Sequence, residues 1–144
     1  MKVAVNNNCG LKLDKKALKK ACLSVMRAEG VRKDAVLSLS AVDEKEMEEI
    51  NRRYLKRDGP TDVIAFSMGE DCEQGHLMGD VLICPRFILN CLREYGVDEE
   101  RVLEYVTAHG VMHLLGYEDE EEKDWKEMDR KQREILGLFE ERRP

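Results

Sequence analysis

The sequence has no uninterrupted apolar run near the roughly 20 residues that a membrane-spanning helix needs. Its first residues, MKVAVNNN, also lack the succession of charged, apolar and small residues that marks a secretory signal. Both absences argue against membrane and exported proteins. We therefore expect a soluble cytoplasmic protein that has no membrane partner.

Paired cysteines are absent too. The five cysteines are scattered, and no two form a C-x-x-C motif. This usage is typical of a reducing compartment, where disulfides rarely persist. We expect packing roles, rather than metal ligation or nucleophilic catalysis, for Cys9, Cys22, Cys72, Cys84 and Cys91.

An excess of basic residues is also missing, since the formal net charge is -6. This sign is unfavourable for contacts with nucleic-acid phosphates. Most of the excess acidity lies in residues 118–144, which carry 11 acidic and 7 basic side chains. A local basic cluster consists of Arg52, Arg53, Lys56 and Arg57. This cluster could bind RNA phosphate, although an ordinary solvated helix end would look the same, so the charges leave both interpretations open.

The length of 144 residues suits one domain with a single core and is too short for two ordinary domains. Alternating apolar residues predict strands at 2–6, 36–42, 63–66 and 81–84. Helical spacing and capping residues predict helices at 14–30, 43–54, 85–95, 98–115 and 121–136. We expect a turn at 6–10, a polar loop at 70–76, and a last helix that packs through Trp125, Met128 and Ile135.

The chemistry is concentrated in one short string of residues. His109 and His113 are four residues apart in a predicted helix, so both imidazoles lie on one face and can bind one metal ion. Gly116 allows the chain to reverse, which brings Asp119 within reach as a third ligand. The resulting H-x3-H-x5-[H/D] spacing is typical of zinc hydrolases, in which three protein ligands leave one position for water.

Two histidines at this spacing also occur as a hydrogen-bonded helix face without any metal. The glycine turn and the third oxygen ligand favour the metal site. The remaining histidine, His76, falls in the predicted polar loop, and we expect it to be exposed.

Peptide hydrolysis of the H-E-x-x-H type requires a Glu directly after the first histidine, where this chain has Gly110. Glu118 and Glu120 could supply a base, but solvent-facing glutamates commonly form such a run. A phosphodiester suits the site better, because a metal polarises the phosphoryl oxygen while the basic cluster stabilises the developing charge.

The string HGVMHLLGY at 109–117 resembles the signature of the YbeY proteins, which are bacterial metal-dependent endoribonucleases. NRRYLKRDGPTDVIAF at 51–66 and LMGDVLICP at 77–85 resemble two further segments of that family, in the same order. Met128 and the triplet at 134–136 fit as well. The likeness therefore covers essentially the whole chain, residues 1–144.

The resemblance implies a single zinc-hydrolase-like α+β domain with a mixed sheet of about four strands flanked by about five helices. It further implies one zinc ion, cleavage of single-stranded RNA, and roles in 16S rRNA 3′ end maturation and ribosome quality control. The implied partners are ribosomal RNA and the small ribosomal subunit.

Carried over to this chain, the resemblance makes His109 and His113 the first two metal ligands. Asp119 stands where the family typically has a third His, and Glu118 where it usually has Asp. Aspartate is an acceptable zinc ligand, but its charge makes the metal a weaker Lewis acid. We therefore predict a more alkaline pH optimum than a three-His relative has, and a downward shift on Asp119→His.

A second departure is Leu55, where many relatives carry an Arg associated with RNA binding or cleavage. We hypothesise that Lys56 or Arg57 replaces it. Ala65 and Ser67 stand where the family usually has Ser and Pro, a change expected to affect local geometry.

Three functions stay under consideration. The first is a metal-dependent endoribonuclease that uses His109, His113 and Asp119. The second is a noncatalytic, zinc-containing ribosome-associated binding factor. The third is a metal-dependent hydrolase of a non-RNA substrate, which Gly110 disfavours.

Overall fold

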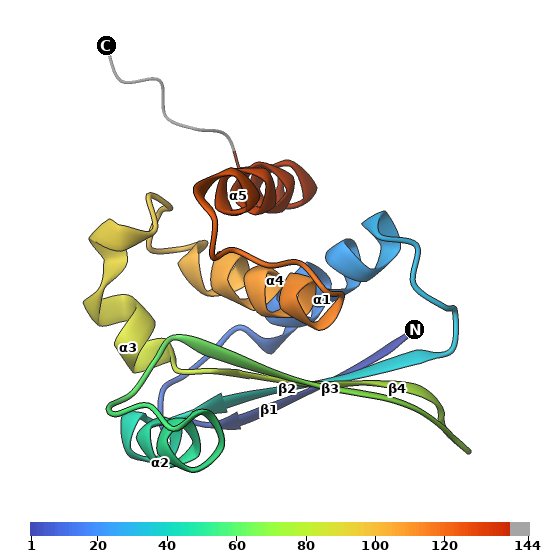
Figure 1. The fold of residues 1–144 in the computed structure, drawn as a ribbon, viewed down its shortest axis with the longest axis horizontal. Coiled ribbons are helices and arrows are strands. Elements are labelled where there is room, and N and C mark those ends of the chain that lie inside the picture. Colours follow the sequence, from blue (N-terminus) through green and yellow to red (C-terminus); the bar gives the residue numbers. More distant parts are fainter. Residues whose placement is uncertain (139–144) are drawn as a thin grey trace.

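The computed structural model describes residues 1–138 and contains four strands, five α-helices and one 3-10 helix within that range (Figure 1). The strands are β1 Lys2–Asn8, β2 Ala35–Val42, β3 Val63–Cys72 and β4 Gly75–Ile83. The helices are α1 Lys15–Ala28, α2 Glu44–Leu55, α3 Pro85–Asn90, η1 Leu92–Glu94, α4 Val102–Leu114 and α5 Glu122–Leu136.

The strands form one sheet in the order β1-β2-β4-β3. β1, β2 and β4 run parallel, and β3 pairs antiparallel with β4. The crossover from β1 to β2 is α1, and β2 reaches β4 through α2 and β3. A short turn joins β3 to β4 and forces the antiparallel pairing. The four-strand mixed sheet with five α-helices in the described range confirms the α+β prediction.

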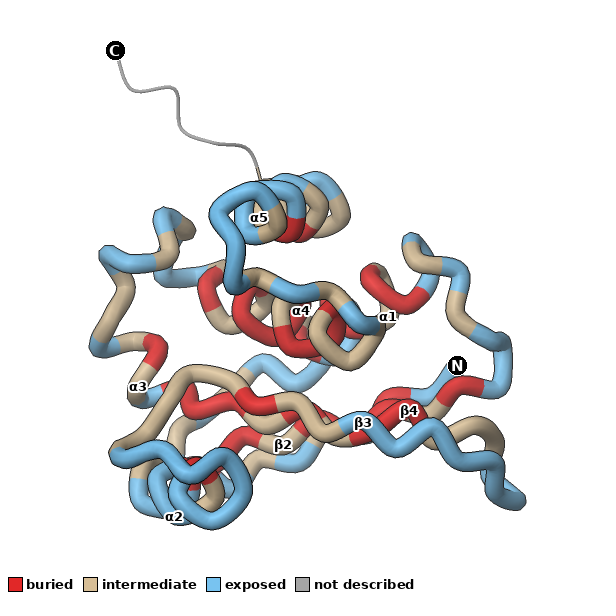
Figure 2. Tube along the Cα trace, viewed as in Figure 1, coloured by how far each residue is buried: buried red, intermediate tan, exposed pale blue. Residues whose placement is uncertain are grey.

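The elements are stacked in layers (Figure 1). α2 covers one face of the sheet, α1 and α4 cover the other, and α5 lies on α4 on the side away from the sheet. α4 is therefore enclosed from several sides, and Figure 2 shows it buried along much of its length. The residues of α4 that are buried are Val102, Tyr105, Val106, Thr107, Ala108, Gly110, Val111 and Met112. This placement holds the histidine-bearing helix rigidly in the molecule.

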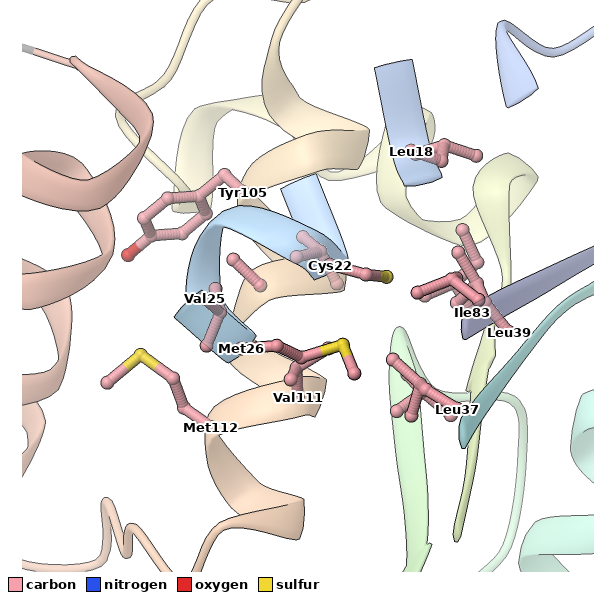
Figure 3. Close-up of a cluster of buried hydrophobic side chains, with 14 of the residues drawn as sticks. Leu18, Cys22, Val25, Met26, Leu37, Leu39, Ile83, Tyr105, Val111 and Met112 are labelled. Atoms are coloured by element: carbon pink, nitrogen blue, oxygen red, sulfur yellow. The ribbon is translucent and has the colours of Figure 1, made fainter. Parts of the chain in front are cut away.

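The main core lies between the sheet and the helices α1 and α4 (Figure 3). Leu37, Leu39 and Ile83 of the strands are fully buried together with Met26 and Val111 of the two helices. Burial of these apolar side chains is the dominant stabilising contribution. A smaller cluster on the α2 side of the sheet consists of Val42, Met47, Ile64 and Cys84.

The helix starts predicted at Asp14 and Asp43 are confirmed as N-caps. The carboxylate of Asp14 accepts from the backbone N–H of Ala17 at 3.1 Å and begins α1. Asp43 begins α2 in the same way, accepting from the N–H of Glu46 at 2.8 Å. Each cap satisfies a backbone donor that the helix cannot pair internally.

The predicted polar loop at 70–76 is wrong, because these residues form the ends of β3 and β4. This hairpin extends past the helices, so its side chains are largely exposed and show no apolar alternation. β1 likewise extends to Asn8, so the turn predicted at 6–10 starts later. Backbone pairing with β2 or between the two hairpin strands supports both segments.

Two helix boundaries also differ from the prediction. The helix expected at 85–95 ends at Asn90 and gives way to η1. Residues 98–100 precede α4 as a turn, in which the N–H of Arg101 donates to the carbonyl of Asp98 at 2.9 Å. Met128 is buried and Ile135 packs against the core as expected, whereas Trp125 is 46% exposed. Within residues 1–138, no helix combines the length and apolar character needed to cross a membrane.

Candidate metal centre

His109, His113 and Asp119 come together as the histidine spacing predicts. The His109 Nε2 atom lies 2.9 Å from His113 Nε2 and 3.0 Å from Asp119 Oδ2. The His113 Nε2 to Asp119 Oδ2 distance is 3.4 Å. The two imidazole rings stand nearly perpendicular, at 85°. One nitrogen from each ring and one carboxylate oxygen therefore face a common point.

The turn after α4 places Asp119. Gly116 adopts a positive φ of 97°, a conformation that costs glycine little, and its N–H donates to the carbonyl of His113 at 3.0 Å. The N–H of Tyr117 donates to the carbonyl of Met112 at 3.1 Å. The chain thus reverses within a few residues and returns past the histidines, as predicted from Gly116.

Both imidazoles are oriented by a hydrogen bond from Nδ1. His109 Nδ1 lies 2.9 Å from Gln132 Oε1, and His113 Nδ1 lies 2.9 Å from the carbonyl of Tyr117. Because these partners are acceptors, each Nδ1 can donate to its partner, and the Nε2 atoms are the ring nitrogens that face Asp119. This arrangement is the one required of a metal-binding histidine.

The two Nε2 atoms and a carboxylate oxygen of Asp119 thus converge, and all three are atoms of the kind that binds a metal ion. Tetrahedral zinc with bonds of about 2.0–2.1 Å separates its ligand atoms by roughly 3.3 Å, and the three distances here lie close to that value. The residues present therefore fit a zinc ion.

Tyr117 connects α5 to the loop that follows α4 and carries Asp119. The ammonium of Lys131 donates to the Tyr117 hydroxyl at 2.6 Å and lies 4.9 Å from the centre of its ring. The hydrogen bond to this hydroxyl raises the pKa of Lys131. Tyr117 therefore contacts His113 through its backbone and α5 through its side chain, and it limits movement of the third ligand.

Gln132 is a functional residue that the sequence analysis missed. It is fully buried on α5, where its side-chain amide donates to the carbonyl of Tyr105 at 3.2 Å while its oxygen faces His109. A recognisable signal was available, because Gln132 lies one helical turn after the buried Met128 and interrupts an apolar stripe with a polar side chain.

A second contact joins the same two helices. The Tyr105 hydroxyl donates to Asp129, which also accepts from Arg133 at 3.0 Å. Burial, aided by the nearby Asp129 carboxylate, raises the pKa of Tyr105 and keeps its hydroxyl protonated. The α4–α5 interface is therefore polar and specific beside the candidate metal centre.

Close packing against the sheet explains why position 110 is a glycine, which the sequence alone did not reveal. A Cβ at this position would lie 2.6 Å from Val81 Cγ1 and 2.7 Å from Val63 Cγ2. The helix packs on the sheet through this bare backbone. A catalytic Glu of the H-E-x-x-H kind has no room here, which strengthens the argument against that type of peptidase.

The three candidate ligands line a cavity of about 730 Å³, which we call the metal cavity. Arg57, Asp62 and Trp125 also line it. Asp62 is held in place because its carboxylate accepts from the N–H of Val63 at 2.7 Å and from the Tyr95 hydroxyl at 3.0 Å. Asp62 is a second residue that the sequence analysis did not single out.

The basic cluster is divided by the fold. All four side chains are exposed, but Arg57 lines the metal cavity, whereas Arg52, Arg53 and Lys56 do not. Lys56 ends α2 in the left-handed conformation, with φ at 57°, and its ammonium donates to the carbonyl of Arg53 at 3.2 Å. Between the two hypothesised substitutes for an arginine at Leu55, the geometry favours Arg57.

Asn51 holds the loop that carries Arg57. The buried Asn51 side-chain amide donates to the carbonyl of Gly59 at 2.9 Å, and the backbone carbonyl of Asn51 accepts from the N–H of Arg57 at 3.3 Å. Leu55 lines the metal cavity and also a second cavity of about 380 Å³ along β3, which we call the β3 cavity. A side chain at position 55 therefore lies where the metal cavity and the β3 cavity meet.

The other acidic and histidine candidates are not part of the three-ligand cluster. Glu118 lines the β3 cavity beside His113, and Glu120 is exposed. His76 is half-buried rather than exposed, and its Nδ1 lies 2.8 Å from Asp71, which also binds Arg32. The hydrogen bond to His76 and the Arg32 charge lower the pKa of Asp71. This network joins the β3–β4 hairpin to the chain before β2.

Comparisons with known proteins identify the family of this chain. A family described as Endoribonuclease YbeY matches residues 4–140. An Endoribonuclease YbeY from Oceanobacillus iheyensis is 42% identical over 120 residues, covering 77% of this chain and 78% of that protein. One from Macrococcus caseolyticus is 39% identical over 117 residues, covering 77% and 76%.

Among solved structures, the solution structure of TM1509 from Thermotoga maritima matches with a TM-score of 0.61 at 28% identity. The match covers 94% of this chain and 87% of that one. The resemblance drawn from the three sequence segments is thus confirmed along nearly the whole chain. The chain belongs to the endoribonuclease YbeY family.

Proposed function

We propose that this protein is a zinc-dependent endoribonuclease that cleaves single-stranded RNA in the cytoplasm, with His109, His113 and Asp119 holding one zinc ion. Its substrate would be ribosomal RNA on the small subunit, in 16S rRNA 3′ end maturation and ribosome quality control. The observation that carries the proposal is the convergence of an imidazole nitrogen of His109, one of His113 and a carboxylate oxygen of Asp119, which all lie within 4.8 Å of one another. Membership of an endoribonuclease family supports RNA as the substrate.

When bound, zinc would polarise a phosphoryl oxygen and favour formation of the nucleophile. Arg57 supplies a guanidinium in the same cavity, where it can pair with the phosphate and stabilise the charge that develops on it. A proton acceptor has to come from outside position 110, because Gly110 carries no side chain. Asp62 and Glu118 are carboxylates that line the two cavities meeting at His113.

The test compares zinc-reconstituted protein with His113→Ala, using a labelled single-stranded RNA. His76→Ala is the matched control, because it removes the histidine that lies in the hairpin network. We expect cleavage by the parent and by His76→Ala, and none by His113→Ala. Bound zinc, measured by metal analysis after gel filtration, should fall in His113→Ala alone. Equal cleavage by all three proteins would contradict the proposal and indicate a contaminating nuclease.

Two alternatives have different outcomes in the same test. A noncatalytic ribosome-associated factor would retain zinc as the parent protein but would not cleave RNA. Its binding to RNA or ribosomes would survive in His113→Ala. A hydrolase of a non-RNA substrate would act on compounds that lack phosphate. The missing base at Gly110 disfavours the second alternative for peptides.

A further inference from the structure

Trp125 is the one tryptophan of the chain, and it is 46% exposed on the first turn of α5. An exposed indole has a large apolar surface in water, so an exposed position at a cavity often marks a contact with a ligand. The nearby Met128, on the same helix, is buried as packing requires. Packing of α5 therefore does not account for the position of Trp125.

Trp125 lies where two cavities meet. It lines the metal cavity and also a neighbouring cavity of about 870 Å³ between η1 and α5, which we call the α5 cavity. Glu94 and Tyr95 line both cavities as well. On the opposite side, Leu55, Val63 and His113 line both the metal cavity and the β3 cavity. Three connected cavities thus form a path, with the metal ligands at its middle.

The charges of the α5 cavity are nearly balanced. Its basic side chains are Arg93, Lys126, Arg130 and Arg133, and its acidic ones are Glu94, Asp129 and Glu134. Arg133 and Arg130 pair with Asp129 at 3.0 Å and Glu134 at 3.2 Å. Such a surface binds phosphate weakly, and its distinctive feature is the exposed indole face. A ligand with a flat aromatic ring suits it better than a strongly anionic one.

We propose that Trp125 is a stacking platform for an unpaired base of the RNA, held beside the phosphate that lies at the metal centre. The inference rests on the proposed function and identifies one subsite of it. An unpaired base exposes its ring face, which an aromatic side chain can stack on without regard to base identity. Bases of a duplex are stacked on one another and are not available. Trp125 therefore favours single-stranded over double-stranded substrate.

The single tryptophan allows a direct measurement. In the zinc-loaded parent, Trp125 fluorescence is followed while a cleavage-resistant 2′-O-methyl single-stranded RNA of about eight nucleotides is added. An abasic ribose-phosphate oligomer of the same length is the control ligand. We expect quenching by the RNA and none by the abasic oligomer, since the phosphates are the same and the bases are missing.

Variants then test the energetic contribution of the ring. Affinity for labelled RNA should fall about tenfold in Trp125→Ala and be largely retained in Trp125→Phe. Tyr54→Ala is the matched control, because Tyr54 is an aromatic residue that is 60% exposed but lines none of the three cavities. Trp125 is exposed, so its replacement should leave the melting temperature close to the parent value.

Equal quenching by both oligomers, or unchanged affinity in Trp125→Ala, would overturn the stacking role. This outcome is distinct from failure of the proposed function. Base-dependent quenching together with absent cleavage by the zinc-loaded parent would refute the nuclease and retain the subsite. If the parent cleaves RNA, and Trp125→Ala changes neither the cleavage rate nor the affinity for RNA, the subsite is refuted and the nuclease is retained.

Discussion

His109 on α4 and Gln132 on α5 are joined by a 2.9 Å hydrogen bond from the ring Nδ1 to the amide oxygen. The amide nitrogen of Gln132 donates to the carbonyl of Tyr105, one turn before His109 on the same helix. Gln132 therefore fixes which ring nitrogen carries the proton and how the ring is oriented. Gln132 would act on a bound metal through His109, as a positioning residue.

Gln132→Leu should weaken zinc affinity by about 10–100-fold, because the His109 ring loses the acceptor that fixes its tautomer. Gln132→Glu keeps an acceptor for Nδ1 and should retain most of the affinity. The measurement is competition for zinc with a chelating indicator, which does not depend on RNA cleavage. Equal affinities of the Leu and Glu variants would show that Gln132 has no positioning role.

Gly110→Ala should destabilise the protein by about 1–3 kcal/mol, because the added methyl group would overlap Val81 and Val63. Intrinsic helix propensity alone predicts the opposite sign, a gain of about 1 kcal/mol. Urea unfolding measures the net effect. Val63→Ala in the same protein should recover part of the loss, and a stabilised Gly110→Ala would contradict the packing described here.

Arg57→Gln should lower RNA cleavage and affinity, because Arg57 lines the metal cavity. Lys56→Gln removes the same charge from a side chain that folds back onto the carbonyl of Arg53, so it is the matched control. We expect a loss of about tenfold or more for Arg57→Gln and little change for Lys56→Gln. Similar losses in both would indicate a general charge effect instead of a specific contact.

Asp119→His should shift the pH profile of cleavage to lower pH. Replacing the carboxylate with a neutral ligand makes a bound metal a stronger Lewis acid, so the nucleophile forms at a lower pH. The measurement is the cleavage rate of parent and variant across a pH series, with zinc content determined for each. An unchanged or alkaline-shifted profile at equal zinc content would contradict the ligand role of Asp119.

Cys22 should resist thiol reagents in the folded protein, because burial raises the pKa of its thiol to about 12. Cys72 is exposed and should react first, and Cys72→Ser should remove that fast phase.

The unfolded chain ionises Cys22 near the ordinary pKa of 9.0, so the free energy of unfolding should fall as pH rises above that value. Urea unfolding at neutral and alkaline pH measures the fall. Rapid labelling of Cys22 would contradict its burial.

Short-range patterns identified much of the site. The helix period places residues four apart on one face, so the pairing of His109 with His113 follows from spacing alone. Gly116 reverses the chain over a few residues, which also brings Asp119 back by local geometry. Apolar alternation identified the buried parts of the strands but not the exposed β3–β4 hairpin, whose stability comes from backbone pairing.

The remaining features depend on packing between segments that are distant in the chain. Gln132 reaches His109 only because α5 lies on α4, and Trp125 faces the cavities only because η1 lies opposite it. The choice of Arg57 over Lys56 depends on the loop that Asn51 holds. Local residue patterns predict the conformation of each segment but not which segments contact one another. Those contacts form on folding, between residues that are far apart in the sequence.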